Sequence, residues 1–96
     1  MEATKADRAD PQRAEVHNHT PWSLAEIETS FPYLGRTVNN WRGRGVALYA
    51  HPSDQTALVS VGVTFNGLMT VVAVEPRSDW TTALDYIQHG KVYVSE

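Results

Sequence analysis

The chain of 96 residues has room for a single domain. Its eight lysines and arginines are outnumbered by eleven aspartates and glutamates, so its formal net charge is −3. This balance is too acidic for a protein that coats nucleic acid through bulk positive charge, and a polyanionic partner would need a local basic patch. The chain has no cysteine, which excludes disulfides, thiolate metal ligands and a thiol nucleophile.

Residues 1–20 contain few apolar side chains apart from alanines and Val16. A segment of this composition buries too little surface to offset the entropy lost on ordering, which predicts a mobile tail followed by one domain over residues 21–96. The segment also has no apolar run of the length that a signal peptide or a membrane span requires. We therefore expect a cytoplasmic protein that does not bind membranes.

The sequence WSLAEI predicts the start of a short helix near the beginning of the domain. Ser23 and Glu26 have the spacing of a capping box, and Trp22 and Ile27 have that of a hydrophobic staple. Pro32 disfavours a helical conformation in the residue before it, so the predicted helix has barely two turns.

Three segments of strand composition follow, at about 45–51, 57–65 and 68–75. The last two are separated by Asn66-Gly67, whose residues both accept the positive φ of a type I′ turn. Asn-Gly between alternating apolar runs is the strongest short-range signal for a hairpin, so these segments are predicted to form a three-stranded antiparallel meander.

The turn also sets the pairing register of the hairpin and sorts its residues between two faces. It would place Val61 opposite Val72 on a face that is almost wholly apolar and that we predict to be the core. The opposite face is mixed in character and carries Leu58, Met69 and Val71. We expect this mixed face to be open to water or to another chain.

A second helix is predicted at about 79–89, because Trp80, Ala83 and Ile87 recur on one side of a helical pattern that ends near Gly90. A short final strand is expected at 91–95. The predicted fold class is therefore α+β, with two layers: a short N-terminal helix, the three-stranded meander, and the C-terminal helix packed on the sheet.

One basic stretch stands out, TVNNWRGRG at residues 37–45. Arg42 and Arg44 follow Trp41, Arg36 precedes the stretch, and no acidic side chain lies among them. Planar guanidinium groups bind phosphates and carboxylates, and an exposed indole can stack on a base or fill a pocket in a partner. The alternative interpretation is a solvated loop whose tryptophan folds down onto the core.

The first functional hypothesis is a small non-enzymatic protein-binding module, which would act as an adaptor, an inhibitor or a subunit of a small assembly. A domain of about 75 residues has only a marginal core, which favours oligomerisation, including a homodimer. A regulatory role without cofactor or metal fits this hypothesis. The predicted partner-binding residues are Arg36, Trp41, Arg42, Arg44, Tyr49, Leu58, Met69 and Val71.

The second hypothesis is a nucleic-acid-binding domain that uses the Arg36, Trp41, Arg42 and Arg44 patch. The expected order of one helix, three strands and one helix is similar to that of double-stranded RNA-binding domains. Those domains carry basic residues at the start of the second helix, whereas here that helix begins SDWTT. The resemblance therefore covers topology alone, and no binding residue is transferred from it.

The third hypothesis is a small hydrolase or nuclease that uses surface histidines and arginines, with His51 and His89 as the histidines. His51 lies near Ser53 and Asp54 in HPSDQT, but residues close in sequence do not make a catalytic triad, and a turn is the simpler interpretation. The sequence HNHT places two histidines two residues apart, which by itself is a weak indication of a metal site.

Overall fold

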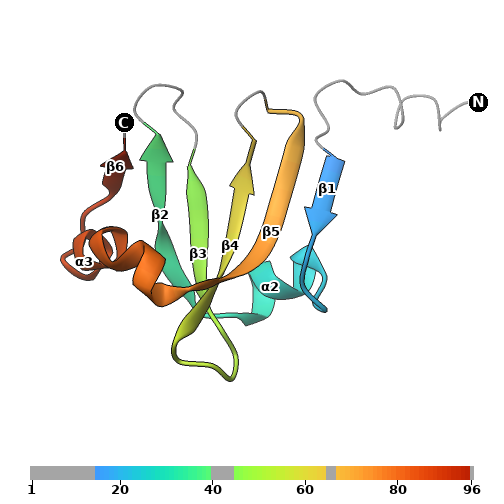
Figure 1. Ribbon diagram of the computed structural model, residues 1–96, viewed down its shortest axis with the longest axis horizontal. Helices are drawn as coiled ribbons and strands as arrows, with labels where there is room; N and C mark the ends of the chain where they lie inside the picture. The colour runs from blue at the N-terminus through green and yellow to red at the C-terminus, as the bar shows by residue number, and fades with distance from the viewer. Residues whose placement is uncertain (1–14, 40–44, 65–66, 96) are drawn as a thin grey trace, which may run out of the picture.

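The computed structural model describes residues 15–39, 45–64 and 67–95 (Figure 1). These residues form one six-stranded mixed sheet with the strand order β1-β5-β4-β3-β2-β6. In chain order the elements are β1 (Glu15–Asn18), α2 (Leu24–Ser30), β2 (Tyr33–Asn39), β3 (Val46–Ala50), β4 (Ala57–Val63), β5 (Met69–Pro76), the 3₁₀ helix η1 (Arg77–Trp80), α3 (Thr81–Gln88) and β6 (Tyr93–Ser95).

The predicted fold class was wrong, because the sheet is larger and of a different kind. Strands β2 to β5 pair antiparallel with their neighbours, and a parallel strand is added at each edge, β1 beside β5 and β6 beside β2. The described part of the chain begins with β1 rather than with a helix. The helix–meander–helix order that resembled double-stranded RNA-binding domains is therefore absent from the described chain.

The strands that the sequence did not predict have weak local patterns. β1 reads EVHN, all four side chains are exposed, and it lies in the segment expected to be a tail. β2 lies in a segment where no strand was predicted, and its pairing with β3 is irregular between Tyr33 and Gly35, which interrupts the alternation that marks a strand. Residues 1–14 of the expected tail lie outside the described residues.

Helix α2 begins and ends as its sequence predicts. The Ser23 hydroxyl caps it by accepting a hydrogen bond from the Glu26 amide at 3.0 Å. At its other end the Phe31 amide donates to the Ile27 carbonyl. Ile27 has no exposed surface and packs with Tyr49 and other core residues, while Trp22 packs against the same cluster.

The β4–β5 pairing confirms the predicted register, with Val61 opposite Val72 and Val59 opposite Val74. Asn66 of the turn lies outside the described residues. The expectation that one face of the hairpin is core and the other open was wrong, since side chains on both faces are fully buried. Val59 and Val72 are buried on one face and Leu48 and Leu58 on the other.

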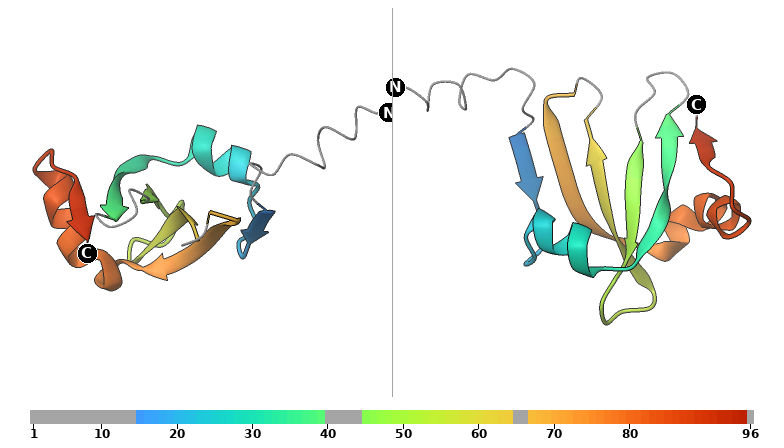
Figure 2. Two further views of the ribbon diagram at one scale, coloured as in Figure 1. Left: turned by 90° about the horizontal axis from the view of Figure 1, so that it is seen from above. Right: turned by 180° about the vertical axis from the view of Figure 1, so that it is seen from behind.

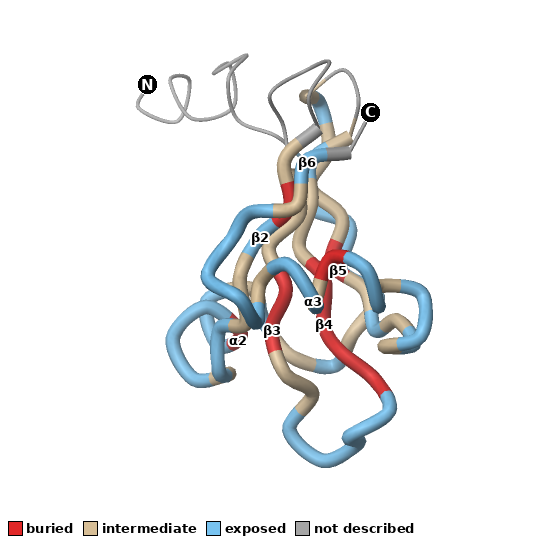
Figure 3. Tube along the Cα trace, turned by 90° about the vertical axis from the view of Figure 1, so that its left-hand side faces the viewer, coloured by how far each residue is buried: buried red, intermediate tan, exposed pale blue. Residues whose placement is uncertain are grey.

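Both faces are buried because a helix lies on each side of the sheet. Figure 2 shows the sheet curled, with α2 on its hollow side between β1 and β2; we call this side the hollow face. On the other side α3 approaches β2, where Ile87 packs against Gly35. Figure 3 shows that the buried residues concentrate along β3 and β4, the two middle strands of the sheet. The arrangement has three layers rather than the expected two.

Gly35 is required by the contact between β2 and α3. Its φ is +146°, and a Cβ added there would lie 2.8 Å from Ile87 Cγ2. Gly90 provides a matched control, because its φ is +74° but nothing lies within 4 Å of an added Cβ.

We predict that Gly35→Ala lowers the free energy of unfolding by more than about 2 kcal/mol, because it adds overpacking to backbone strain. Gly90→Ala adds the backbone strain alone and should lower it by about 1 kcal/mol. Urea denaturation followed by circular dichroism measures both. Ile87→Ala should lower the stability less in the Gly35→Ala background than in the unmodified chain, because it removes the clash with the added methyl group. Equal losses in the two backgrounds would show that there is no such clash.

Candidate functional site

The predicted partner-binding residues do not gather on one surface. Tyr49 and Leu58 are both buried, and they belong to opposite faces because Leu58 is paired with Ala50, the neighbour of Tyr49. Burial raises the pKa of Tyr49, and the nearby Glu28 raises it further. Met69 and Val71 are partly exposed on β5.

The basic stretch is only partly described by the structure. Arg36 lies on β2, is exposed, and is paired with Ala47 on the hollow face. Trp41, Arg42 and Arg44 lie outside the described residues. Their role as a partner-binding or phosphate-binding patch therefore stays a prediction.

The cluster in HPSDQT forms a turn between β3 and β4. The Nδ1 atom of His51 accepts hydrogen bonds from the amides of Ser53 and Asp54, at 3.1 and 2.9 Å. The Oδ1 atom of Asp54 accepts bonds from the Thr56 amide at 2.9 Å and from its hydroxyl at 2.6 Å. Both bonds from Thr56, the hydroxyl bond foremost, lower the pKa of Asp54. These hydrogen bonds stabilise the backbone of a turn, as the simpler interpretation of HPSDQT predicted.

The two histidines of HNHT are exposed, with His17 in β1 and His19 just after it. His17 Nε2 lies 3.6 Å from Glu15 Oε1. Within the described ranges, no group of three His, Cys, Asp or Glu side chains could hold a metal ion. In the same part of the chain, no helix combines the length and the apolar character needed to cross a membrane.

The strand register divides the hollow face into three rows of side chains that run across the strands. The first row is Tyr33, Tyr49, Val59 and Val74. The second row is Arg36, Ala47, Val61, Val72 and Asn18. The third row is Val63, Thr70 and Val16, on β4, β5 and β1.

Helix α2 covers only part of the hollow face. Ile27 packs with residues of the first two rows, among them Val59 and Val72. In the third row Val63 is 43% exposed and Val16 is 49% exposed. We call Val16, Thr70 and Val63 the open row. It is a strip of two valines and one threonine that ends at β1, the edge of the sheet.

The opposite face carries a polar network that the sequence analysis did not identify. Ser60 is 5% exposed, and its hydroxyl donates to Glu75 Oε2 at 2.9 Å. The Trp80 indole donates to the other carboxylate oxygen, Oε1, at 2.6 Å. The only local signal was a serine and a glutamate in otherwise apolar strands. The network ties η1 to the sheet, because each oxygen of the carboxylate accepts a bond from a different element.

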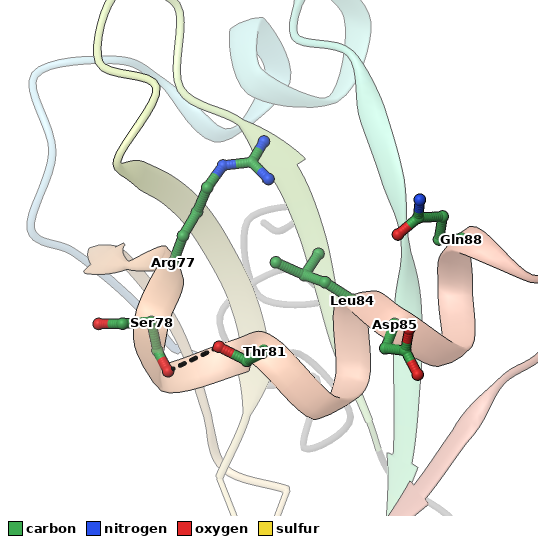
Figure 4. Close-up of a pocket in the computed structure, with 6 residues that line it drawn as sticks. All are labelled: Arg77, Ser78, Thr81, Leu84, Asp85 and Gln88. Atoms are coloured by element: carbon green, nitrogen blue, oxygen red, sulfur yellow. Dashed lines mark hydrogen bonds between the residues drawn. The ribbon is translucent and has the colours of Figure 1, made fainter.

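An open groove of about 370 Å³ runs along η1 and α3 (Figure 4). The Nε atom of Arg77 is buried there and has no hydrogen-bond partner. The residues that line the groove are Arg77, Ser78, Thr81, Leu84, Asp85 and Gln88. Sequence reasoning assigned no role to Arg77, because a single arginine after Pro76 has no distinctive pattern.

Trp80→Phe should lower the free energy of unfolding by about 1–2 kcal/mol, because it removes the indole donor to the part-buried Glu75 carboxylate and keeps an aromatic ring. Urea denaturation measures the change. The same substitution in a Glu75→Gln background should have a smaller effect. Equal effects in both backgrounds would mean that the loss comes from packing alone.

The Asp54 carboxyl should titrate with a pKa below the ordinary value of 3.8. This pKa should rise in Thr56→Val, because the substitution removes the hydrogen bond from the Thr56 hydroxyl. A lowered carboxyl pKa contributes stability above the unfolded pKa, and this contribution is lost as the pH falls through the folded pKa. A carboxyl ¹³C NMR titration measures the shift. Thr29→Val, whose hydroxyl bonds to Ala25 instead, should leave it unchanged. An unchanged Asp54 titration in Thr56→Val would contradict the assigned cause.

The geometry described above can be set against known proteins. No family model, no curated protein and no solved structure matches this chain. Its function must therefore be inferred from the arrangement of its own residues.

Proposed function

We propose that this protein is a non-enzymatic protein-binding module that acts as a subunit of a small assembly, and that its partner is a second copy of the chain paired through β1. The single observation that carries the proposal is that the open row ends at this sheet edge. A regulatory role and a cytoplasmic location belong to the same proposal.

The outer edge of β1 is suited to pairing with another strand. β1 is the first strand in the sheet order, and no strand of the described chain pairs with its outer side. Such an edge presents backbone amides and carbonyls that a further strand can pair with. A partner strand added there would continue the open row from β4 and β5 across β1.

The side chains of β1 favour pairing with an antiparallel copy of itself. In a symmetric pair centred on Val16, each Glu15 would lie opposite His17 of the second copy. An imidazole N–H can donate a hydrogen bond to a carboxylate, and a protonated imidazole also attracts it. A register centred on His17 would instead place the two imidazoles opposite each other. Donor–acceptor complementarity therefore supports the register centred on Val16.

This register would also join the apolar surfaces of the two copies. Val16 would lie beside Val16 of the second copy, and the two open rows would form one continuous strip. β1 has only four residues, so the contact would bury less than the roughly 1,200 Å² of a typical stable interface. We therefore expect a monomer–dimer equilibrium that depends on concentration.

Val16→Cys tests this arrangement in a chain that has no other cysteine. Residues opposite each other in an antiparallel pair have Cα atoms about 4.5–5.5 Å apart, within the range of a disulfide. Mild oxidation should give a covalent dimer, measured on a non-reducing gel. Val74→Cys is the matched control, because Val74 lies on the same face with 42% exposure but on β5, inside the sheet.

Sedimentation equilibrium provides the second measurement. The average mass of the unmodified chain should rise with concentration, and Val16→Lys should abolish the rise without unfolding, because Val16 is half exposed. Equal cross-linking at positions 16 and 74, together with a monomer at every concentration, would overturn the proposal.

A further inference from the structure

We infer that two copies of the chain, paired through β1, bind a zinc ion between them, and that the ligands are Glu15 and His17 of each copy. The inference rests on the proposed function, because a single chain supplies only half of these ligands. Zinc in proteins takes four nitrogen, oxygen or sulfur ligands in a tetrahedral arrangement. By joining the two copies, the ion would regulate the assembly.

Glu15 and His17 already lie together on the surface of one chain. They are two residues apart in β1, so their side chains share one face of the strand. His17 Nε2 lies 3.6 Å from Glu15 Oε1, and the two side chains are 42% and 73% exposed. An imidazole nitrogen and a carboxylate oxygen, both of them zinc ligands, are therefore within reach of a metal ion from solution.

The described part of one chain does not complete a metal site. In it, no group of three His, Cys, Asp or Glu side chains could hold a metal ion. On β5 the neighbours of Glu15 and His17 are Met69 and Val71, which bring neither a carboxylate nor an imidazole. The remaining ligands of a four-coordinate ion must come from another molecule.

The free edge of β1 would place the ligands of a second copy close by. The Glu15 amide donates to the Leu68 carbonyl at 3.1 Å, so the backbone groups of Glu15 point toward β5. Those of Val16, the next residue, point away from it. In the register centred on Val16, the two Val16 residues would exchange backbone hydrogen bonds. Glu15 and His17 of the second copy would then form a pair of the other kind, whose Cα atoms are only about 4.5 Å apart.

This arrangement gathers four ligands at one place. Each Glu15 would face His17 of the other copy across the new edge, and the same two side chains are neighbours within each chain. The four groups lie on the face opposite the open row, because Val16 between them belongs to that row. Two carboxylates balance the charge of Zn²⁺. Two imidazoles favour zinc over Mg²⁺ and Ca²⁺, which prefer oxygen ligands.

Sedimentation equilibrium of the whole chain, with ZnCl₂ or with EDTA, tests the site. Free zinc at about ten times its dissociation constant should lower the dissociation constant of the dimer about tenfold, because it binds the dimer and not the monomer. MgCl₂ at the same concentration should have no effect. Isothermal titration calorimetry at a concentration where the dimer prevails should find one zinc ion for two chains.

Two histidine variants test the ligand assignment. His17→Gln removes an exposed ligand and should abolish the effect of zinc on the dimer. His19→Gln is the matched control, because His19 is also exposed and belongs to the same HNHT sequence but lies farther from the centre of the pair. A register centred on His17 would place His19 opposite Glu15 of the second copy. Loss of the zinc effect in His19→Gln would therefore contradict the assignment.

The outcomes separate the zinc site from the proposed dimer. A dimer in EDTA that zinc does not tighten would overturn the site and leave the dimer standing. A monomer in EDTA that zinc converts into a dimer would support the site and contradict pairing without metal. A monomer under both conditions would overturn both proposals. One zinc ion per chain with no change in mass would mean adventitious binding to the histidines, and it would also overturn the site.

Discussion

The packing of Ile27 against the hollow side of the sheet is the contact on which the rest of the structure depends. Helix α2 has seven residues, and Ile27 is the one that it buries completely. Through Val59 and Val72 this side chain joins β4 and β5 to the helix that connects β1 to β2. A helix of this length packs over the middle of the first two rows and leaves Tyr33 and Val74, at the ends of the first row, exposed. In the third row neither Val16 nor Val63 belongs to the Ile27 cluster.

On the face of the sheet opposite the hollow face, η1 and α3 make closer and more polar contacts with the strands. Gly35 has no side chain, so the Ile87 side chain of α3 packs directly against the backbone of β2. The Glu75 carboxylate accepts one bond from Ser60 and one from Trp80, which fixes η1 at the end of β5. The Glu75 carboxylate is fully hydrogen-bonded, whereas the buried Nε atom of Arg77, two residues later, has no hydrogen-bond partner.

The candidate sites could be predicted from the sequence only to a small extent. Val63 was expected in the core, but it is half exposed because no helix reaches it. Leu58 was expected at a partner surface, but it is buried on the face that α3 approaches. Alternation along a strand shows which residues share a face. It does not show which part of that face another element will cover, because this depends on the length and path of the connecting helices.

The sequence by itself determined the features whose physical causes are local. The Ser23 cap acts over three residues, and the register of β4 with β5 is the one that Asn66-Gly67 predicts from the sequence. A final strand was predicted at 91–95, but only the tertiary structure decided β1 and the position of β6 in the sheet, because each is a parallel edge strand whose partner is far away in the sequence. A short exposed strand such as β1 has no apolar alternation of its own. Its hydrogen bonds to β5 form only once the rest of the sheet has brought that edge into place.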